Sequence, residues 1–326
     1  MRKFPKFLFC VLGLFFSFFA NAQNFHISVE PSLGVSCGVL NELLYHSTDT
    51  SKKISLLEWE RNLILGGTKL NLSYNALRFE SSFWVAVPRI CGEMRDSDWL
   101  NTRNYSMKTN YSVGDNYSDG NYDATISLIY DFEPTPGFFI SPKIQAQYAF
   151  DSFYRKKGSK GWYGDAEHSS DGKNHYWYDE EAQEYPSVNP ETGKTRKLAG
   201  IDYYRHSVYL WAGLALGFNY KKFHGDLGFL ISPFTYFSAE DRHHTATSND
   251  NVYHEIQQDF FSAYKFNLNL SYAISRFFDL TFNCETLITL TLKGDLYIGW
   301  AKDVDQPSGA SAQTTSAGLG CRIKLR

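Results

Sequence analysis

Two short polar runs in the chain contain residue types that can perform acid–base chemistry. One run holds Asp96 and Asp98, and the other holds Asp241 and His243. Each pair is spaced i, i+2, so both members of a pair share one face if the backbone is extended. Asp241 could then orient His243 and stabilise its cation, while His243 takes a proton from a water held between it and Asp96. The two pairs therefore predict a hydrolytic site.

The same spacing has other readings. Asp-x-Asp and Asp-x-His are common in solvated loops, so an ordinary charged loop is one alternative. A metal site is another, because His243, His244 and His254 have acidic neighbours, although their spacing matches no strong ligand pattern. General acid–base help supplies about 10²–10⁴ in rate, so a hydrolase would also need a preorganised oxyanion contact. Two close carboxylates such as Asp96 and Asp98 would raise the pKa of one member and keep a proton available for a hydrogen bond.

Alternating segments predict the strands that would position these residues. Apolar and polar side chains alternate strictly in 207–220, 264–272, 278–283 and 316–325, which places each set on one face of a sheet. A water-soluble sandwich would alternate as well. The polar face carries charged and amide groups, however, and the apolar rows tend to end in Tyr or Phe, as the girdles of membrane barrels do. The alternating stretches also approach the roughly 9–11 residues that cross a bilayer at a tilt.

The connections refine this into a fold class. Short turns alternate with long polar segments at about 91–121, 156–200, 240–257 and 292–313, which is the pattern of an up-and-down barrel with long outer loops. We therefore expect an all-β protein, a ten-stranded antiparallel up-and-down transmembrane β-barrel spanning residues 23–326. A passive pore is less favoured, since ten strands leave a lumen that side chains such as Tyr209, Trp211 and Lys265 would largely fill.

The N-terminus indicates export. Residues 1–22 combine a basic start, an apolar run and a small-x-small cleavage site ending at Ala22, the layout of a signal peptide. Its removal leaves 29 basic and 35 acidic residues, a net charge of −6, which makes nucleic acid an unsuitable partner. We expect the four remaining cysteines to be unpaired thiols, because four in so large a chain do not form a disulfide scaffold. They are Cys37, Cys91, Cys284 and Cys321.

Several motifs resemble those of a known family. Gly92–Trp99 reads Gly-x-Met-x-Asp-x-Asp-Trp, which is similar to the outer-loop signature of the omptins, ten-stranded outer-membrane endopeptidases. Asp241-x-His243 is similar to their second catalytic pair, at a similar distance downstream. Three N-terminal segments resemble the family's first hairpin in the same order: Ser32–Gly34, Glu42–Tyr45 and Lys53–Trp59. The resemblance extends over most of the chain after residue 22, although only these segments are specific.

The resemblance implies an aspartyl endopeptidase that cleaves between paired basic residues. Glu42 would bind the basic side chain before the scissile bond, and the catalytic residues would be Asp96, Asp98, Asp241 and His243. The protein would lie in the cell outer membrane of a Gram-negative-type bacterium with its active site facing outside. Its partners would be peptide or protein substrates at the cell surface and membrane lipid, with no nucleic acid and no metal.

Three departures from the family pattern qualify these expectations. The family's second acidic pocket residue corresponds to Ala239, which predicts weaker selectivity for a basic residue. The family's lipid A row, Tyr-x-Glu-x-Arg, corresponds to Tyr148–Ser152, which reads Tyr-Ala-Phe-Asp-Ser, so we expect no cofactor and no firm dependence on lipopolysaccharide. The chain ends Leu325-Arg326 where barrels usually end in an aromatic residue. The alternative function is a non-catalytic omptin-like barrel that acts as an adhesin or a structural outer-membrane protein.

Overall fold

The computed structural model describes most of the chain outside the N-terminal segment. The described residues are 25–101, 104–155, 160–163, 176–179, 186–188, 195–197, 200–244, 251–299 and 301–325. The predicted signal peptide, residues 1–22, lies outside them, as does most of the predicted loop at 156–200.

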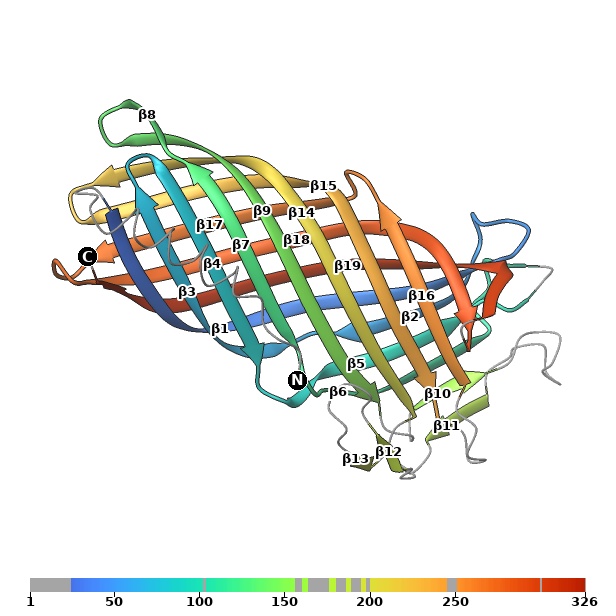
Figure 1. Cartoon of the computed structure of the whole chain (residues 1–326). Coiled ribbons are helices and arrows are strands. Elements are labelled where there is room, and N and C mark those ends of the chain that lie inside the picture. The colour runs from blue at the N-terminus through green and yellow to red at the C-terminus, as the bar shows by residue number, and fades with distance from the viewer. Residues whose placement is uncertain are drawn as a thin grey trace, which may run out of the picture.

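The described chain is built from antiparallel β-strands (Figure 1). The first strands are β1 (Phe25–Tyr45), β2 (Lys53–Glu60), β3 (Leu63–Tyr74), β4 (Leu77–Ala86), β5 (Arg89–Asp98), β6 (Asn110–Ser118), β7 (Tyr122–Tyr130), β8 (Phe132–Thr135) and β9 (Phe138–Arg155). Short strands follow at β10 (Lys160–Tyr163), β11 (Tyr176–Asp179), β12 (Pro186–Val188) and β13 (Thr195–Lys197). The remaining strands are β14 (Ile201–Tyr220), β15 (Phe223–His243), β16 (Asn251–Asp259), β17 (Ala263–Ala273), β18 (Phe278–Ile298) and β19 (Ala301–Lys324).

The main sheet closes on itself. Strand β1 pairs with β19 from Ser28↔Lys324 to Leu44↔Ser308, which joins the two ends of the sheet. Four pairs of successive strands continue one another around the ring: β2 with β3, β4 with β5, β6 with β7, and β16 with β17. The result is a ring of ten strands in up-and-down order, which confirms the predicted fold class. Closure leaves no free edge along the ring.

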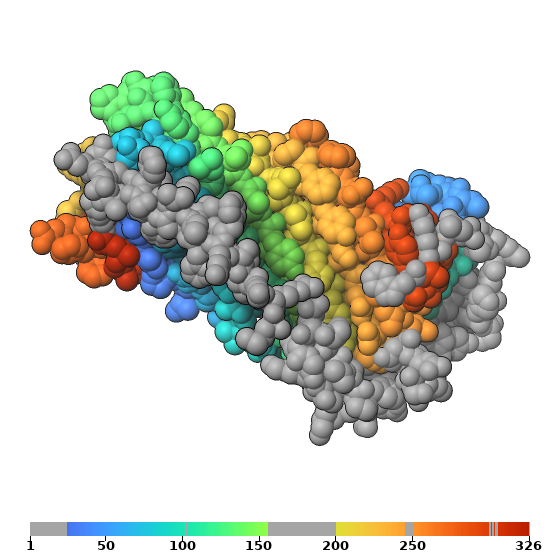
Figure 2. Space-filling view, in the orientation of Figure 1, coloured from blue at the N-terminus to red at the C-terminus, as the bar shows by residue number. Residues whose placement is uncertain are grey.

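The outside of the ring carries an exposed apolar band. Its members come from strands all around the sheet and include Leu33, Val35, Phe83, Val85, Ile126, Ile144, Leu214, Leu216, Leu227, Phe229, Phe266, Leu280 and Leu319. Exposed aromatic residues gather near the end with the short turns, among them Tyr74, Tyr130, Phe132, Tyr220 and Phe223. In Figure 2 the wall over β9, β14 and β15 is continuous. A band of this kind with an aromatic rim is typical of membrane barrels.

Helices do not contribute to this arrangement. Within the described ranges, no helix is long and apolar enough to cross a membrane.

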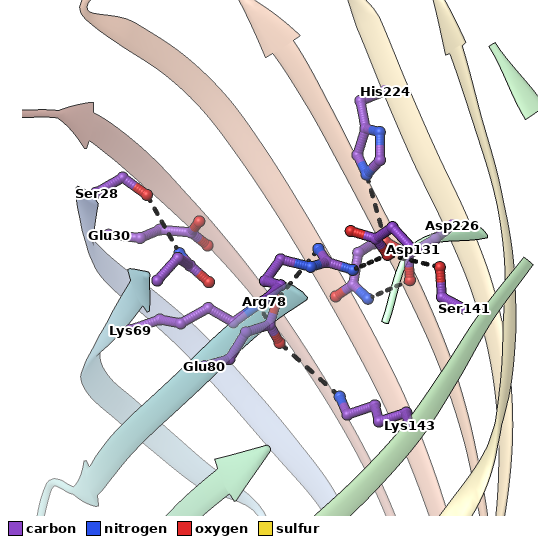
Figure 3. Close-up of polar contacts among 12 residues, drawn as sticks. Ser28, Glu30, Lys69, Arg78, Glu80, Asp131, Ser141, Lys143, His224 and Asp226 are labelled. Atoms are coloured by element: carbon purple, nitrogen blue, oxygen red, sulfur yellow. Dashed lines mark hydrogen bonds and ion pairs between the residues drawn. The ribbon is translucent and has the colours of Figure 1, made fainter. Parts of the chain in front are cut away.

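Charged side chains fill the lumen near the short-turn end (Figure 3). Glu80 lies 3.2 Å from Arg78 and 3.9 Å from both Lys69 and Lys143. Arg78 also pairs with Asp131 at 3.2 Å. The polar faces predicted from the sequence therefore point inward, where opposite charges neutralise one another.

Large side chains pack across the middle of the lumen. Trp211, Tyr209 and Lys265 are at most 3% exposed, and Tyr209 stacks on Trp211 with ring centres 5.1 Å apart. Lys265 Nζ lies 4.8 Å from the centre of the Trp211 ring and donates to Gln147 at 2.7 Å. A cavity of about 190 Å³ remains in the lumen, lined in part by Glu80, Asp123 and Arg205. The interior is thus packed with side chains, as expected from the number of strands.

Three of the four segments predicted as long outer loops consist largely of strand within the described residues. Strands β5 and β6 lie within 89–118, β15 and β16 flank the connection at 244–250, and β18 and β19 leave a short connection near residue 299. The strands continue past the apolar band because their polar residues still find ladder partners in the ring. These extended hairpins form the right-hand end of the barrel in Figure 1.

Two bulges change which residues face the lumen at this end. In β5 the register shifts between Ile90 and Gly92, and Gly92 has φ 128°. The register of β15 against β14 also shifts between Leu210 and Ala212, where β15 contains one extra residue near Pro233. A one-residue slip exchanges the two faces of a strand. Past the bulges the inward residues are therefore Asp96 and Asp98 in β5, and Thr235, Phe237, Ala239, Asp241 and His243 in β15.

The four described cysteines are free. Cys284 is paired in register with Ala317, and Cys321 with Leu280, so the two thiols lie at different levels of the β18–β19 pair. The expectation of unpaired thiols is confirmed.

We predict that Arg61→Met destabilises the barrel by about 3–5 kcal/mol, because it leaves Asp151 buried without its cation. Arg61 Nε donates to Asp151 at 2.8 Å, and its Nη1 donates to Ser36 at 2.6 Å. Urea unfolding of the refolded protein in detergent micelles, followed by tryptophan fluorescence, measures the loss. The double variant with Asp151→Asn should recover most of the stability; an equal loss in both variants would contradict the assigned role of the ion pair.

Candidate active site

The Asp241–His243 pair forms a hydrogen-bonded dyad at the hairpin end of β15. His243 Nε2 lies 2.6 Å from Asp241 Oδ2. The Asp241 side chain is 4% exposed and that of His243 is 37% exposed, so the imidazole reaches solvent while its partner is buried. The Tyr253 ring packs against His243 edge-on, with centres 5.6 Å apart. Because a carboxylate only accepts hydrogen bonds, Nε2 donates and Nδ1 is left to accept a proton.

Asp96 and Asp98 face the dyad from β5. They lie on the inward face beyond the Gly92 bulge, and Asp96 is paired in register with Leu57 of β2 and Ser112 of β6. His243 and Asp241 lie near enough for their charges to affect the pKa of Asp96. The two pairs are therefore close together at the hairpin end of the lumen, which is called the mouth below. The structure thus brings together all four residues that the sequence singled out as a hydrolytic constellation.

This mouth lies beyond the apolar band. On β15 the exposed apolar side chains of the band end at Phe229, and on β1 they end at Val35, whereas the site residues lie near the far ends of the same strands. Burial here comes from neighbouring side chains of the protein.

Burial and like charge raise the pKa values of the two β5 carboxyls. For Asp96, burial and then the neighbouring Asp98 raise the pKa to about 6, although Arg155 and His243 act in the opposite direction. Burial also raises the pKa of Asp98, opposed by a hydrogen bond from Ser55. The carboxylate of Asp241 raises the pKa of His243 above 6.5. A proton can therefore be held among these groups near neutral pH.

Arg155 adds a cation beside the two pairs. Its Nη1 donates to Ser112 at 2.8 Å, and its charge lowers the pKa of both Asp96 and His243. A fixed guanidinium in this place could stabilise negative charge that develops on a substrate carbonyl.

Glu42 lies deeper in the mouth and is joined there by Glu255. Both carboxyls are almost fully buried, at 3% and 0% exposed, and they share a hydrogen bond. Burial raises the pKa of Glu42 well above its usual value and that of Glu255 to about 8. Gln257 Nε2 donates to Glu255 Oε2 at 2.8 Å and to Ser308 Oγ at 2.8 Å. The result is a cluster of buried acids next to the dyad.

Aromatic side chains form the base of this region. Trp59 stacks on Tyr203 with ring centres 5.3 Å apart and on Phe153 at 6.1 Å. All three are fully buried. The Tyr203 hydroxyl has no hydrogen-bond partner, and its pKa is raised by burial, with Glu42, Glu255 and Asp241 contributing. The hydroxyl is thus surrounded by the acids of the mouth.

The three histidines considered as metal ligands turn to separate partners. His243 pairs with Asp241, His244 Nε2 lies 3.4 Å from Asp202, and His254 Nδ1 lies 3.7 Å from Glu240. Across the part of the chain that the structure describes, no group of three or more His, Cys, Asp or Glu residues is arranged to hold a metal ion.

The sequence did not reveal Glu255, Tyr203, Trp59 or Arg155 as parts of the site. Glu255, Tyr203 and Arg155 come from strands without a recognised motif, and Trp59 ends the recognised segment Lys53–Trp59. Only the closure of the ring places them at one mouth. Glu255 lies in 251–259, where Glu255 and Gln257 alternate with apolar Ile256, a signal that predicts an inward polar face without saying what it faces.

The arrangement can support hydrolysis. It combines a histidine whose side chain reaches solvent, a carboxylate that holds the imidazole, a facing carboxyl pair that holds a proton, and a nearby cluster of buried acids. A water positioned between His243 and Asp96 would be within the reach of general-base catalysis.

Comparison with known proteins supports the same interpretation of the fold. The crystal structure of the outer membrane protease OmpT from Escherichia coli aligns with a TM-score of 0.75 and 16% identity over 94% of this chain and 99% of that chain. Two other barrels align with TM-scores below 0.5. They are the translocator domain of the autotransporter NalP from Neisseria meningitidis (0.33, 8% identity, 98% and 94% covered) and the Pseudomonas putida toluene transporter TodX (0.29, 8% identity, 92% and 90% covered). No match was found among curated protein sequences.

The family model settles the classification. The model of the Omptin family matches residues 23–295, which is most of the chain and includes the dyad, the facing carboxyl pair, Glu42 and Glu255. With the shared fold of the OmpT structure, this makes the protein an outer-membrane barrel of the protease type: the chain belongs to the omptin family.

Proposed function

We propose that this protein is an endopeptidase that cleaves peptides or proteins at basic residues, with the mouth of the barrel facing the outside of the cell. The observation that carries the proposal is the 2.6 Å hydrogen bond between buried Asp241 and solvent-accessible His243, facing the Asp96 and Asp98 pair. Membership of the omptin family supports protease activity. The dyad and the facing pair supply the means of activating water.

The proposed reaction begins with a water held between His243 and Asp96. His243 Nδ1 takes one proton as the water oxygen attacks the scissile carbonyl carbon, and the carbonyl π electrons move to oxygen. Asp241 stabilises the imidazolium that forms. Collapse of the tetrahedral intermediate breaks the C–N bond, and the proton passes from His243 to the leaving amine. Water is consumed, and one acid and one amine are released.

Glu42 is proposed to bind the basic side chain before the scissile bond. Its carboxyl is buried next to the dyad, and one of its oxygens has no hydrogen-bond partner. Charge-assisted hydrogen bonds from Arg or Lys to a carboxylate are about twice as strong as neutral ones. A basic side chain seated there would leave the following peptide bond near His243.

We expect His243→Ala to lower kcat/KM on a fluorogenic dibasic peptide by about 10²–10⁴, because it removes the general base. The refolded proteins are compared in detergent micelles. His224→Ala is the matched control: His224 lies at the opposite end of the barrel, 3.6 Å from Asp226, and its loss should leave turnover unchanged. Equal cleavage by His243→Ala and wild type would refute the role of His243. Absence of wild-type turnover on varied dibasic peptides would instead favour the adhesin alternative.

The pH dependence should follow His243. His243 must be neutral to accept a proton, so kcat/KM rises as pH increases through its pKa, which Asp241 holds above 6.5. In Asp241→Asn that negative charge is gone and burial, which lowers the pKa, remains. The acid limb of the profile should therefore move to lower pH, while the maximum falls because the imidazolium is less stabilised. An acid limb that stays in place would assign it to another group.

Gly92→Ala should lower kcat clearly while the protein still folds, at a moderate cost in the free energy of unfolding. A Cβ at φ 128° is strained and would meet the Glu60 side chain, so relaxation would disturb the bulge that turns Asp96 and Asp98 inward. We expect a cost of about 1–3 kcal/mol in unfolding free energy and at least about a tenfold loss of kcat, the size of a 1.4 kcal/mol barrier change. Gly120→Ala is the control, since an added Cβ there meets nothing within 4 Å. Unchanged kcat in Gly92→Ala would show that the bulge does not position the carboxyls.

A further inference from the structure

Strand register places a carboxylate directly beside the position where the family's second pocket acid is missing. Ala239 of β15 is the residue opposite Glu255 of β16, and both face the lumen. Directly opposed residues in an antiparallel pair have Cβ atoms about 4.5–5.5 Å apart, a separation that a glutamate side chain can span. We propose that Glu255 supplies the second carboxylate of the substrate pocket from the neighbouring strand and, with Glu42, selects an Arg or Lys side chain.

The two carboxyls form one unit with unused hydrogen-bonding capacity. Glu42 and Glu255 share a hydrogen bond, and Glu255 Oε2 is held by Gln257. Glu42 Oε2 and Glu255 Oε1 are buried and have no partner. Unpaired buried carboxyl oxygens are costly, so their retention in a packed mouth points to a donor that arrives with a ligand.

Other polar atoms of the same mouth also lack partners. The Tyr203 hydroxyl, Trp59 Nε1 and Asp241 Oδ1 are buried without a hydrogen bond. The oxygens of Tyr203 and Asp241 offer acceptors for the charged end of a long basic side chain. An arginine guanidinium, with five donors in a planar fork, matches several acceptors at once.

The protein's own cation leaves this charge incompletely balanced. Arg205 is buried beside the acids, but its Nη1 donates to the Ser311 carbonyl at 3.1 Å and its guanidinium lies 4.6 Å from the centre of the Phe237 ring. Against this one arginine stand Glu42, Glu255 and Asp241, with Asp96 further out in the mouth. Burial keeps the pKa of Glu255 near 8 and that of Glu42 well above normal, so part of this charge is neutralised by protons that a bound cation would displace.

This assignment revises the expectation drawn from Ala239. The second acid is present, and it has moved across one strand. Selectivity for a basic residue before the scissile bond should therefore be retained. The proposal rests on the proposed peptidase function for its kinetic test, and a binding test below is independent of turnover.

The kinetic test compares Glu255→Gln with wild type on three peptides that differ only before the scissile bond, which carry Arg, Lys or the neutral isostere citrulline. Loss of a charged hydrogen bond should lower kcat/KM for the Arg and Lys peptides by about 10- to 100-fold and change the citrulline rate by less than about threefold. Glu240→Gln is the matched control, because Glu240 is on the outward face and pairs with Arg242 at 2.8 Å. Equal losses on Arg and citrulline peptides, or no loss on either, would overturn the proposal.

A relocation variant tests the geometry. The double variant Ala239→Asp/Glu255→Gln places the acid on β15. Its ratio of kcat/KM for the Arg peptide to that for the citrulline peptide should be at least about tenfold higher than in Glu255→Gln. No recovery in a variant that refolds would mean that Glu255 acts through the stability of the mouth and not through recognition. If Glu255→Gln does not refold, Glu255→Asp takes its place, and an Arg-to-citrulline ratio unchanged from wild type would overturn the proposal.

The binding test uses the His243→Ala background, in which substrate is not consumed. Dissociation constants for the Arg and citrulline peptides are measured with and without Glu255→Gln by calorimetry in micelles. The Arg-to-citrulline affinity ratio should fall by about 10- to 100-fold on loss of the Glu255 charge. An unchanged ratio would overturn the pocket assignment. If wild type cleaves none of the peptides but the ratio falls, the proposed peptidase function fails and the pocket assignment stands.

Discussion

A side chain on a closed sheet has only two environments, and strand phase decides which one it enters. In this barrel one phase leads to an exposed apolar band and the other to a charged, packed lumen. A one-residue slip would exchange them along a whole strand. The bulges at Gly92 and Pro233 use that sensitivity locally. On the short-turn side of the bulges, the strands place their apolar side chains on the outer face. Beyond the bulges, toward the hairpin end, the strands point the two motif pairs into one mouth. The candidate site therefore depends on two single-residue insertions in the ladder.

The mouth contains several acids close together with few neighbouring cations, whereas acids elsewhere in the lumen lie next to basic side chains. Near the short turns Glu80 lies close to Arg78 and two lysines. At the hairpin end Arg205 is buried beside Glu255, and Glu42, Glu255 and Asp241 have unpaired oxygens that are shielded from solvent. Such a cluster does not stabilise the fold, since desolvation of each carboxyl is opposed by too little positive charge. Closure of the sheet and the packed layer beneath it must hold the acids together. That imbalance distinguishes the acids of the mouth from the ion-pair network near the short turns.

Much of the fold could be predicted from the sequence, because period-two alternation and turn spacing are local properties. Rows such as 207–220 show which face is apolar, and counting the segments gives the ring of ten strands. The length of the hairpins could not be predicted. Beyond the apolar band, polar and apolar residues alternate less clearly, and such sequences are typical of loops. The motif pairs in β5 and β15 could be recognised for the same local reason. The neighbours of these motifs could not, because Trp59, Tyr203 and Glu255 meet only through long-range register.

Register also explains why a missing acid at Ala239 misleads when a motif is read along one strand. The pocket does not distinguish the strand from which a carboxylate comes; it depends on where the oxygens lie. On the same face of an antiparallel pair, the opposed position is as near to a pocket as the next inward residue two along the strand, which is some 6–7 Å away. A glutamate is longer than an aspartate by one methylene, so it can reach from the neighbouring strand. The Ala239↔Glu255 pair has this geometry, and the chemistry of the mouth can be conserved while the linear motif is not.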